Sequence, residues 1–163
     1  MTNPNLSFDT ARSIESPVGN INIYAKDGAV VFLTMGEPSV LAIGSDPVAE
    51  QAAQQLGAYF AGKSKVLDFP VATAGTEFQE SVWQQIAKIP FGKTVSYADI
   101  ARAIGKPLAS RAVGGAVGAN PVPLVIGCHR VMGASGRITG YSGGAGIPTK
   151  RWLLAHEGIG SND

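Results

Sequence analysis

The residues best suited to nucleophilic chemistry lie in one stretch, 122–131. Cys128 is the only cysteine of the chain, and one of its two histidines, His129, follows directly. A cysteine reacts as the thiolate, so a histidine that accepts the thiol proton would activate it. A carboxylate can hold such a histidine in the useful tautomer, and Glu157 is the candidate. Because adjacent side chains rarely point the same way, we expect a water to relay the proton.

Other uses of these residue types remain open or are disfavoured. A lone cysteine is commonly a buried, inert residue, and the pattern alone favours that alternative. One cysteine excludes an internal disulfide framework and suggests a reducing compartment. Two histidines, one cysteine and one glutamate lack the spacing of zinc ligands, so we expect no metal and no cofactor. No apolar run is long enough for a membrane span, and the N-terminus lacks a signal-peptide pattern.

The composition predicts a folded chain with an asymmetric charge. Of 163 residues, 45% are hydrophobic and 15% charged, which is typical of a globular protein. Residues 1–75 contain 4 basic and 7 acidic side chains, whereas residues 76–163 contain 9 basic and 5 acidic ones. The half that contains the cysteine is therefore the basic half, which weakly favours a polyanionic partner.

The first half predicts a small sheet and one helix. Residues 1–10 are typical of a polar tail, and residues 11–35 alternate in polarity between turn signals, which predicts an antiparallel meander. Asp46 and Pro47 are typical of a helix N-terminus, and Gly62 is typical of its end. Nothing before residue 76 offers chemistry.

The second half predicts four helices. A capping box begins at Thr76, and Ser96 caps the next helix. Ser110 is expected to cap a third helix, 111–118, after a tight turn that contains glycine; two helices joined in this way are typical of a helix-turn-helix. Thr149 is expected to cap the last helix.

The third helix has an unusual composition. Arg111 is its only long polar side chain, so it lacks the residues that read base edges in a major groove. Gly114 and Gly115 each cost roughly 1 kcal/mol relative to alanine, which indicates a close approach. The approach is either to another element of the protein or to a sugar-phosphate wall. The second alternative describes a helix that binds DNA without reading its sequence.

Two cations lie in the first turn of the last helix, Lys150 and Arg151. The helix dipole disfavours positive charge there, so an external phosphate would explain the placement. A solvated face is an equally good explanation for Lys150. Before the cysteine, residues 120–123 form a rigid bend in which Asn120 can bond the nearby backbone.

Several of these segments together resemble the O6-alkylguanine-DNA alkyltransferases. The resemblance extends over residues 76–158 and, more loosely, the turn at 16–19. The most specific segments are 111–116, 120–123, 128–131, 140–144 and 152–158. This resemblance strongly favours a reactive over an inert Cys128.

The resemblance implies an α+β protein of two domains. Residues 1–75 would form a small α/β domain of the ribonuclease H-like type. Residues 76–163 would form a helical domain with a winged-helix or helix-turn-helix DNA-binding motif and the site of alkyl transfer. The protein would be a monomer in the cytoplasm, of bacterial type, acting on nucleoid DNA.

The implied activity is direct-reversal DNA repair. As a methylated-DNA–[protein]-cysteine S-methyltransferase, the chain would move an alkyl group, typically methyl, irreversibly from O6 of guanine to Cys128. Each molecule would react once. The partner would be double-stranded DNA bearing O6-alkylguanine, and O4 of thymine is a second candidate substrate. No cofactor is implied.

The resemblance also assigns roles to residues. The catalytic set is Cys128, His129, Glu157 and Asn120. The substrate-binding set is Tyr97, Tyr141, Ser142 and Val131, with Tyr97 bonding the leaving guanine and Ser142 lying against O6. The DNA-binding set is Arg111, Ser96, Ala112, Gly114, Gly115 and Arg130. Arg111 would fill the space that the extruded nucleotide leaves in the base stack, and extrusion is cheapest for a poorly paired lesion.

One residue departs from the family pattern. Family members typically have proline before the cysteine, and this chain has Gly127. If the backbone there suits proline, Gly127→Pro should keep activity and add roughly 0.4–1 kcal/mol of stability. The zinc site of some members is not expected, because no cysteine or histidine precedes Cys128. Two other functions stay open: a non-catalytic module that binds alkylated DNA, and a repurposed acceptor of alkyl groups from small molecules.

Overall fold

The computed structural model describes residues 7–160 and contains two compact units, one extending to Thr73 and one starting at Ala74. Most of the tail expected at 1–10 lies outside the described residues. At Thr10 the tail prediction was wrong, because this residue already pairs with Ala25 in the first strand. No helix in the described part is long and apolar enough to cross a membrane.

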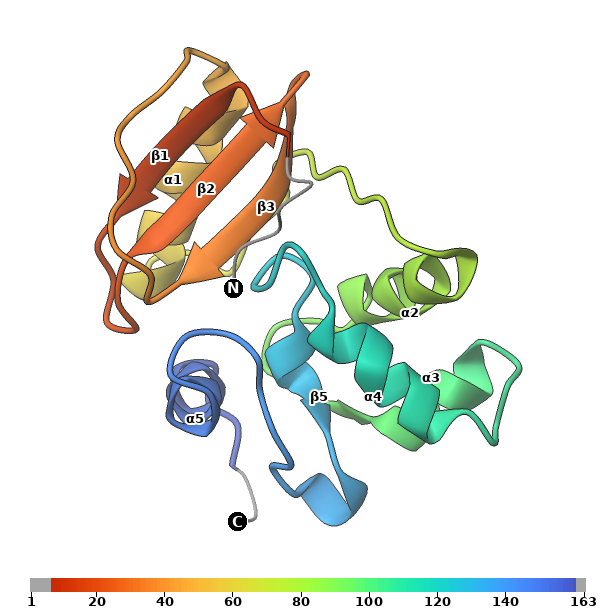
Figure 1. Cartoon of the computed structure of the whole chain (residues 1–163). Coiled ribbons are helices and arrows are strands. Elements are labelled where there is room, and N and C mark those ends of the chain that lie inside the picture. The colour runs from red at the N-terminus through yellow and green to blue at the C-terminus, as the bar shows by residue number, and fades with distance from the viewer. Residues whose placement is uncertain (1–6, 161–163) are drawn as a thin grey trace. The chain divides into compact units, whose positions relative to one another are not determined.

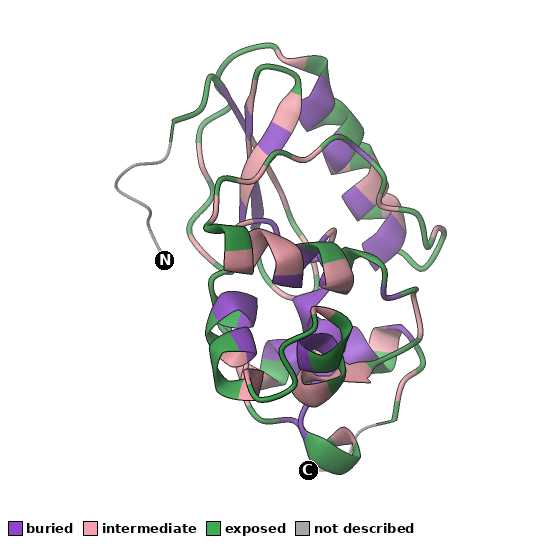
Figure 2. Ribbon diagram, turned by 90° about the vertical axis from the view of Figure 1, so that its right-hand side faces the viewer, coloured by how far each residue is buried: buried purple, intermediate pink, exposed green. Residues whose placement is uncertain are grey.

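The first unit is a three-stranded sheet with one helix against it (Figure 1). The strands β1 (Thr10–Ile14), β2 (Ile21–Lys26) and β3 (Ala29–Met35) are antiparallel in the order β1-β2-β3, which confirms the predicted meander. The helix α1 (Pro47–Phe60) begins as expected, since the Asp46 side chain accepts a hydrogen bond from the Val48 amide. Its buried side, purple in Figure 2, faces the sheet. The residues of that side are Val48, Ala49, Ala52, Leu56, Tyr59 and Phe60.

The second unit consists of short helices around a two-stranded parallel sheet. Its elements are α2 (Glu77–Ala87), β4 (Val95–Ser96), α3 (Tyr97–Ala103), α4 (Ser110–Gly118), η1 (Cys128–Arg130), β5 (Val131–Met132), η2 (Ala134–Gly136) and α5 (Ile147–His156). The strands β4 and β5 pair in parallel, so the start of α3 and the end of η1 lie side by side. Figure 1 shows α3 and α4 as consecutive short helices.

Two of the four N-caps predicted for this second unit are correct. Thr76 and Ser96 each form a complete capping box with the third residue of the helix that follows. Ser110 was wrong as a cap, because α4 begins one residue earlier, after Ala109, which is held by a backbone bond to Lys106. Thr149 was also wrong, because α5 begins at residue 147 and the Thr149 hydroxyl instead accepts the Ala145 amide.

The core of the second unit fixes the helices that surround the cysteine. The indole nitrogen of Trp83 in α2 donates a buried hydrogen bond to the Ala116 carbonyl of α4, at 2.8 Å. Met132, Ile138 and Leu154 form an apolar cluster that joins β5, the following loop and α5. The segment that begins at Cys128 packs against α5, and Cys128 shares a cavity with residues of α4.

Candidate active site

The bend before Cys128 is braced by Asn120. Its amide nitrogen donates to the Ile126 carbonyl at 2.7 Å, and its amide oxygen accepts the Val122 N–H at 2.9 Å. The Cys128 amide then donates to the Ile126 carbonyl, which closes a tight turn centred on Gly127 at φ −72° and ψ 63°. These angles are those of an inverse γ-turn. Asn120 therefore holds the loop that delivers the thiol to the start of η1.

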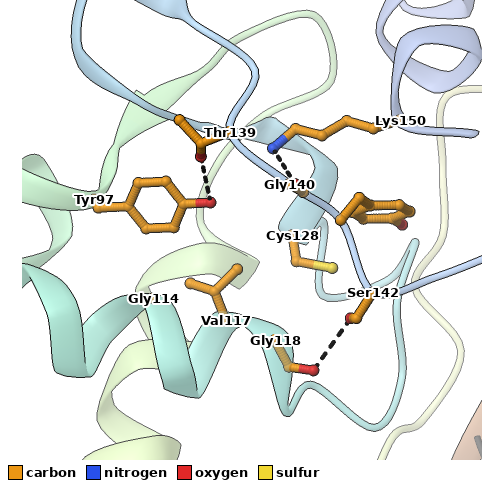
Figure 3. A pocket seen from close by; sticks show the side chains of 10 residues that line it. Tyr97, Gly114, Val117, Gly118, Cys128, Thr139, Gly140, Ser142 and Lys150 are labelled. Carbon is orange, nitrogen blue, oxygen red and sulfur yellow. Dashed lines mark hydrogen bonds between the residues drawn. The ribbon is translucent and has the colours of Figure 1, made fainter. Parts of the chain in front are cut away.

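Cys128 lies in a cavity of about 320 Å³ and is only 4% exposed. The cavity is lined by Tyr97, Gly114, Val117, Gly118, Cys128, Thr139, Gly140, Tyr141, Ser142 and Lys150. Figure 3 shows the sulfur between the end of α4 and the loop 139–142. The Ser142 hydroxyl donates to the Gly118 carbonyl at 3.1 Å, so the loop is joined to the C-terminus of α4.

Three of the four residues expected to bind substrate line this cavity. They are Tyr97, Tyr141 and Ser142. The Thr139 hydroxyl lies 3.4 Å from the hydroxyl of Tyr97, at the opposite end of the cavity from Ser142 (Figure 3). Val131 is the exception: its side chain is completely buried and its residue pairs with Val95 in the small sheet, behind the cavity wall. A direct substrate contact by the Val131 side chain is therefore not supported.

The predicted histidine–carboxylate pair is present. Nε2 of His129 lies 2.6 Å from Oε2 of Glu157, and both side chains are fully buried. Nδ1 of His129 is buried and has no hydrogen-bond partner among residues 7–160. With Nε2 protonated and bonded to Glu157, Nδ1 is the free base that can accept a proton.

Arg130 does not face solvent, which contradicts its predicted contact with DNA. It is 8% exposed, and its Nε and Nη2 donate to the two oxygens of Glu157 at 2.8 and 2.9 Å. Its Nη1 donates to the Ile89 carbonyl at 2.9 Å. A guanidinium buried in this way has no access to a phosphate, so the DNA-binding prediction for Arg130 was wrong.

Lys150 is also buried, so neither explanation from the sequence describes it. It is 1% exposed, and its ammonium donates to the Val131 carbonyl at 2.6 Å and to the Gly140 carbonyl at 3.3 Å. It lines the cavity beside Cys128 (Figure 3). The sequence-based argument from the helix dipole took Thr149 as the cap, but α5 begins at residue 147, so Lys150 is its fourth residue.

The electrostatics of the cavity favour a neutral resting state. Burial raises the pKa of Cys128, while hydrogen bonds from Asn120 and Tyr141 and the charge of Lys150 act against that shift. Burial lowers the pKa of His129, against the hydrogen bond and charge of Glu157. The resting pair is therefore a thiol and a neutral imidazole, and the thiolate forms when the proton leaves the thiol.

The outer face of α4 is open. Arg111, Ala112 and Gly115 are exposed, and a Cβ added at Gly115 would meet no atom within 4 Å. A Cβ at Gly114 would lie 4.0 Å from the Tyr97 ring, which is an ordinary contact. Tight packing within the protein therefore does not explain these glycines. Ser96 is partly buried and its hydroxyl accepts the Asp99 amide as a helix cap.

The backbone angle of Gly127 would suit proline, but the neighbouring Arg130 leaves no room for a side chain there. Its φ of −72° is close to the value that a proline ring imposes. A Cβ at this position would lie 2.9 Å from Nη1 and 3.2 Å from Cδ of Arg130. The missing side chain is thus replaced by the guanidinium of Arg130.

No group of three or more histidine, cysteine or acidic residues in the described part could hold a metal ion.

Comparisons with known proteins agree on one family. A family model described as "6-O-methylguanine DNA methyltransferase, DNA binding domain" matches residues 77–159. A methylated-DNA–protein-cysteine methyltransferase of Mycolicibacterium paratuberculosis is 44% identical over 151 residues, which is 90% of each chain. The protein of the same name from Methanosarcina acetivorans is 41% identical over 88% of this chain and 95% of its own.

Solved structures agree as well. The O6-methylguanine methyltransferase of Mycobacterium tuberculosis is 40% identical, with a TM-score of 0.80 over 94% of this chain and 95% of its own. A structure of the Mycobacterium tuberculosis protein OGT in complex with DNA gives a TM-score of 0.81 at 42% identity, over 90% and 91%. This chain belongs to the 6-O-methylguanine DNA methyltransferase family.

Proposed function

We propose that this protein repairs DNA by direct reversal, as a methylated-DNA–[protein]-cysteine S-methyltransferase that transfers a methyl group from O6 of guanine to Cys128. The observation that supports this most strongly is a single cysteine in a cavity, next to a fully buried His129–Glu157 pair. The family relatives that share about two fifths of the sequence have the same activity in their names.

The chemistry begins with removal of the thiol proton. The proton of Cys128 passes through a water to Nδ1 of His129, and Glu157 stabilises the resulting imidazolium. The thiolate attacks the methyl carbon, so an S–C bond forms as the O6–C bond breaks. The electron pair of that bond stays on the guanine, which leaves the reaction as the unmodified base after it takes up a proton. The thioether is stable, so each protein molecule reacts once.

The cavity provides groups of the right kind for the leaving base. The hydroxyl of Tyr97 would donate a hydrogen bond to the guanine ring and offset the negative charge that develops there. Tyr141 forms a wall of the cavity, and Ser142 lies on the O6 side. O4 of thymine presents a similar exocyclic oxygen and is a second candidate substrate.

We further propose that double-stranded DNA lies along α4. Its exposed face consists of small residues around one long side chain, Arg111, which suits close contact with a sugar-phosphate backbone without base reading. Arg111 would fill the gap left by the extruded base.

In finer detail, we infer a ribonuclease H-like first domain and a winged-helix motif in the second. We also propose that the protein acts as a monomer. We propose that it acts on nucleoid DNA in the cytoplasm.

The test is the mass of the intact protein after incubation with duplex DNA that contains one O6-methylguanine. We expect the mass to rise by one CH₂ unit, with the change on the peptide that contains Cys128. Cys128→Ser and an unmodified duplex are the controls. An unchanged mass of the wild-type protein would refute the proposal.

Two other outcomes define the alternatives. Tight binding to lesion DNA without any mass change would indicate a non-catalytic binding module. The repurposed acceptor is tested with Arg111→Ala. If small molecules are the real donors, this variant should transfer methyl groups as fast as the wild type. If duplex DNA is the substrate, it should be slower by roughly tenfold or more, because base extrusion costs a few kcal/mol.

A further inference from the structure

The carboxylate of Glu157 is contacted by more donors than a histidine alone requires. Oε2 accepts from Nε2 of His129 and from Nη2 of Arg130, and Oε1 accepts from Nε of Arg130 and from the Gly92 amide at 3.1 Å. The guanidinium therefore holds both oxygens in a two-pronged contact. Such a contact fixes the plane and the rotation of the carboxylate as well as its charge.

A buried carboxylate needs this support to act on a histidine. Burial disfavours the ionised form, and a proton shared between a carboxyl group and an imidazole can reside on either. A permanent positive charge on the far side of Glu157 favours the carboxylate. The carboxylate can then only accept, so the bonded nitrogen of His129 has to carry a proton. The other nitrogen, Nδ1, is left as the base.

The same charge also limits how readily His129 is protonated. The charged groups that act on His129 are Glu157, which raises its pKa, and Arg130 and Lys150, which lower it. Arg130 is the one that contacts Glu157 directly. Without its charge, both the carboxylate and the imidazole would bind protons more readily as the pH falls.

The position of Arg130 depends on its neighbour three residues earlier. A side chain at Gly127 would meet Nη1 of Arg130 at 2.9 Å, closer than real Cβ contacts come. The guanidinium is not free to move away, because Ile89 and Glu157 accept its hydrogen bonds. The guanidinium that bonds Glu157 therefore occupies the space that a side chain at Gly127, in the turn before Cys128, would need.

We propose that Arg130 is a positioning residue for alkyl transfer: it holds Glu157 as an oriented carboxylate, so that His129 is neutral and presents Nδ1 to the thiol, and Gly127 leaves the room for its guanidinium. This inference rests on the proposed function for its kinetic consequence. The protonation state and tautomer of His129, which the inference also specifies, can be measured without any alkyl transfer.

The experiment compares the wild type with Arg130→Met, Arg130→Gln and Arg130→Lys. The ¹⁵N NMR signals of histidine are followed from pH 5 to pH 9; only two histidines are present, and a His156→Gln control assigns them. In parallel, the rate constant for methyl transfer to Cys128 is measured over the same range. Circular dichroism and thermal unfolding confirm that each variant is folded.

In the wild type we expect a neutral His129 with the proton on Nε2 at pH 7. In the Met and Gln variants we expect its titration midpoint, and the acidic limb of the rate profile, to move to higher pH by about one unit. The Lys variant keeps the charge. The acidic limb of its pH–rate profile should stay at the wild-type pH, while its rate constant should be a few-fold lower. A neutral variant whose rate falls equally at every pH would overturn the proposal and leave Arg130 a purely structural residue.

Two further outcomes are decisive. A wild-type His129 that has its proton on Nδ1 at pH 7 would overturn the proposal even if no neutral variant could be purified. If the wild type transfers no methyl group while the NMR results are as expected, the proposed function fails, and only the structural part of the inference stands, namely that Arg130 sets the protonation state of His129.

Discussion

The ammonium nitrogen of Lys150 lies 2.6 Å from the carbonyl oxygen of Val131, and both residues are fully or almost fully buried. The same ammonium reaches the Gly140 carbonyl at 3.3 Å. One side chain of α5 thus joins the strand that follows the cysteine segment to the loop that covers the cavity. It also places a cation beside Cys128, which favours the thiolate.

Lys150→Met should therefore slow the reaction in a defined way. The variant keeps most of the length of the side chain but removes its charge and both hydrogen bonds. We expect the pKa of Cys128 to rise further, because one of the groups that lower it is lost. Methyl transfer at pH 7.5 should fall by roughly tenfold or more. The thiol pKa is measured from the pH dependence of iodoacetamide modification, and an unchanged dependence would contradict this role. Lys63→Met, on an exposed site, is the control.

The buried imidazole of His129 should make the protein less stable in mild acid. Its pKa is lowered in the folded state, chiefly by burial. Below the ordinary value of 6.5, the unfolded chain therefore binds a proton before the folded chain does, and the free energy of unfolding falls as the pH falls. His129→Gln cannot bind that proton. Urea unfolding at pH 7.5 and pH 5.5 should show a smaller loss for the variant than for the wild type, and equal losses would contradict the expectation.

The parts of the site that could be predicted from the sequence are those set by local pattern or by family motif. The caps at Thr76 and Ser96 depend on residues three positions apart, so the sequence alone identifies them. The pairing of His129 with Glu157 spans 28 residues. Residue types made Glu157 the candidate, and the family motifs that contain both residues then assigned the pair. Arg130 and Lys150 were misplaced because nothing local distinguishes a buried cation from a solvated one. Their burial depends on acceptors that the fold brings from far along the chain.

The glycines of α4 allow stability and DNA contact to be separated. Gly115 is exposed, and beyond the nearby backbone of its own helix no atom of residues 7–160 lies within 4 Å of an added Cβ. Gly115→Ala should raise the free energy of unfolding by about 0.5–1 kcal/mol, since alanine favours the helix. Gly115→Leu should also fold normally, but should weaken binding to duplex DNA and slow repair by tenfold or more, because the larger side chain keeps the backbone away. Gel-shift titration and thermal unfolding test both effects. A leucine variant with normal DNA binding would show that DNA does not approach this face closely.

Gly127 gives a prediction whose sign depends on Arg130. Proline suits the φ of −72°, which alone would add about 0.4–1 kcal/mol. Its Cβ, however, meets the guanidinium of Arg130 at 2.9 Å, and each hydrogen bond to a charged group that is weakened costs about 1.5–3 kcal/mol. The second effect is larger, so we expect Gly127→Pro to lower the free energy of unfolding by about 1 kcal/mol, the opposite of the gain expected from the sequence.

The same substitution in an Arg130→Met background separates the two effects. There the guanidinium is absent, so only the benefit of the proline ring remains, and Gly127→Pro should raise the free energy of unfolding by about 0.4–1 kcal/mol relative to Arg130→Met alone. Urea unfolding of the four proteins at pH 7.5 measures the cycle. A gain of equal size in both backgrounds would mean that Arg130 moves aside without cost. In that case the space between Gly127 and Arg130 would not explain why this chain departs at residue 127 from the proline that the family pattern leads us to expect.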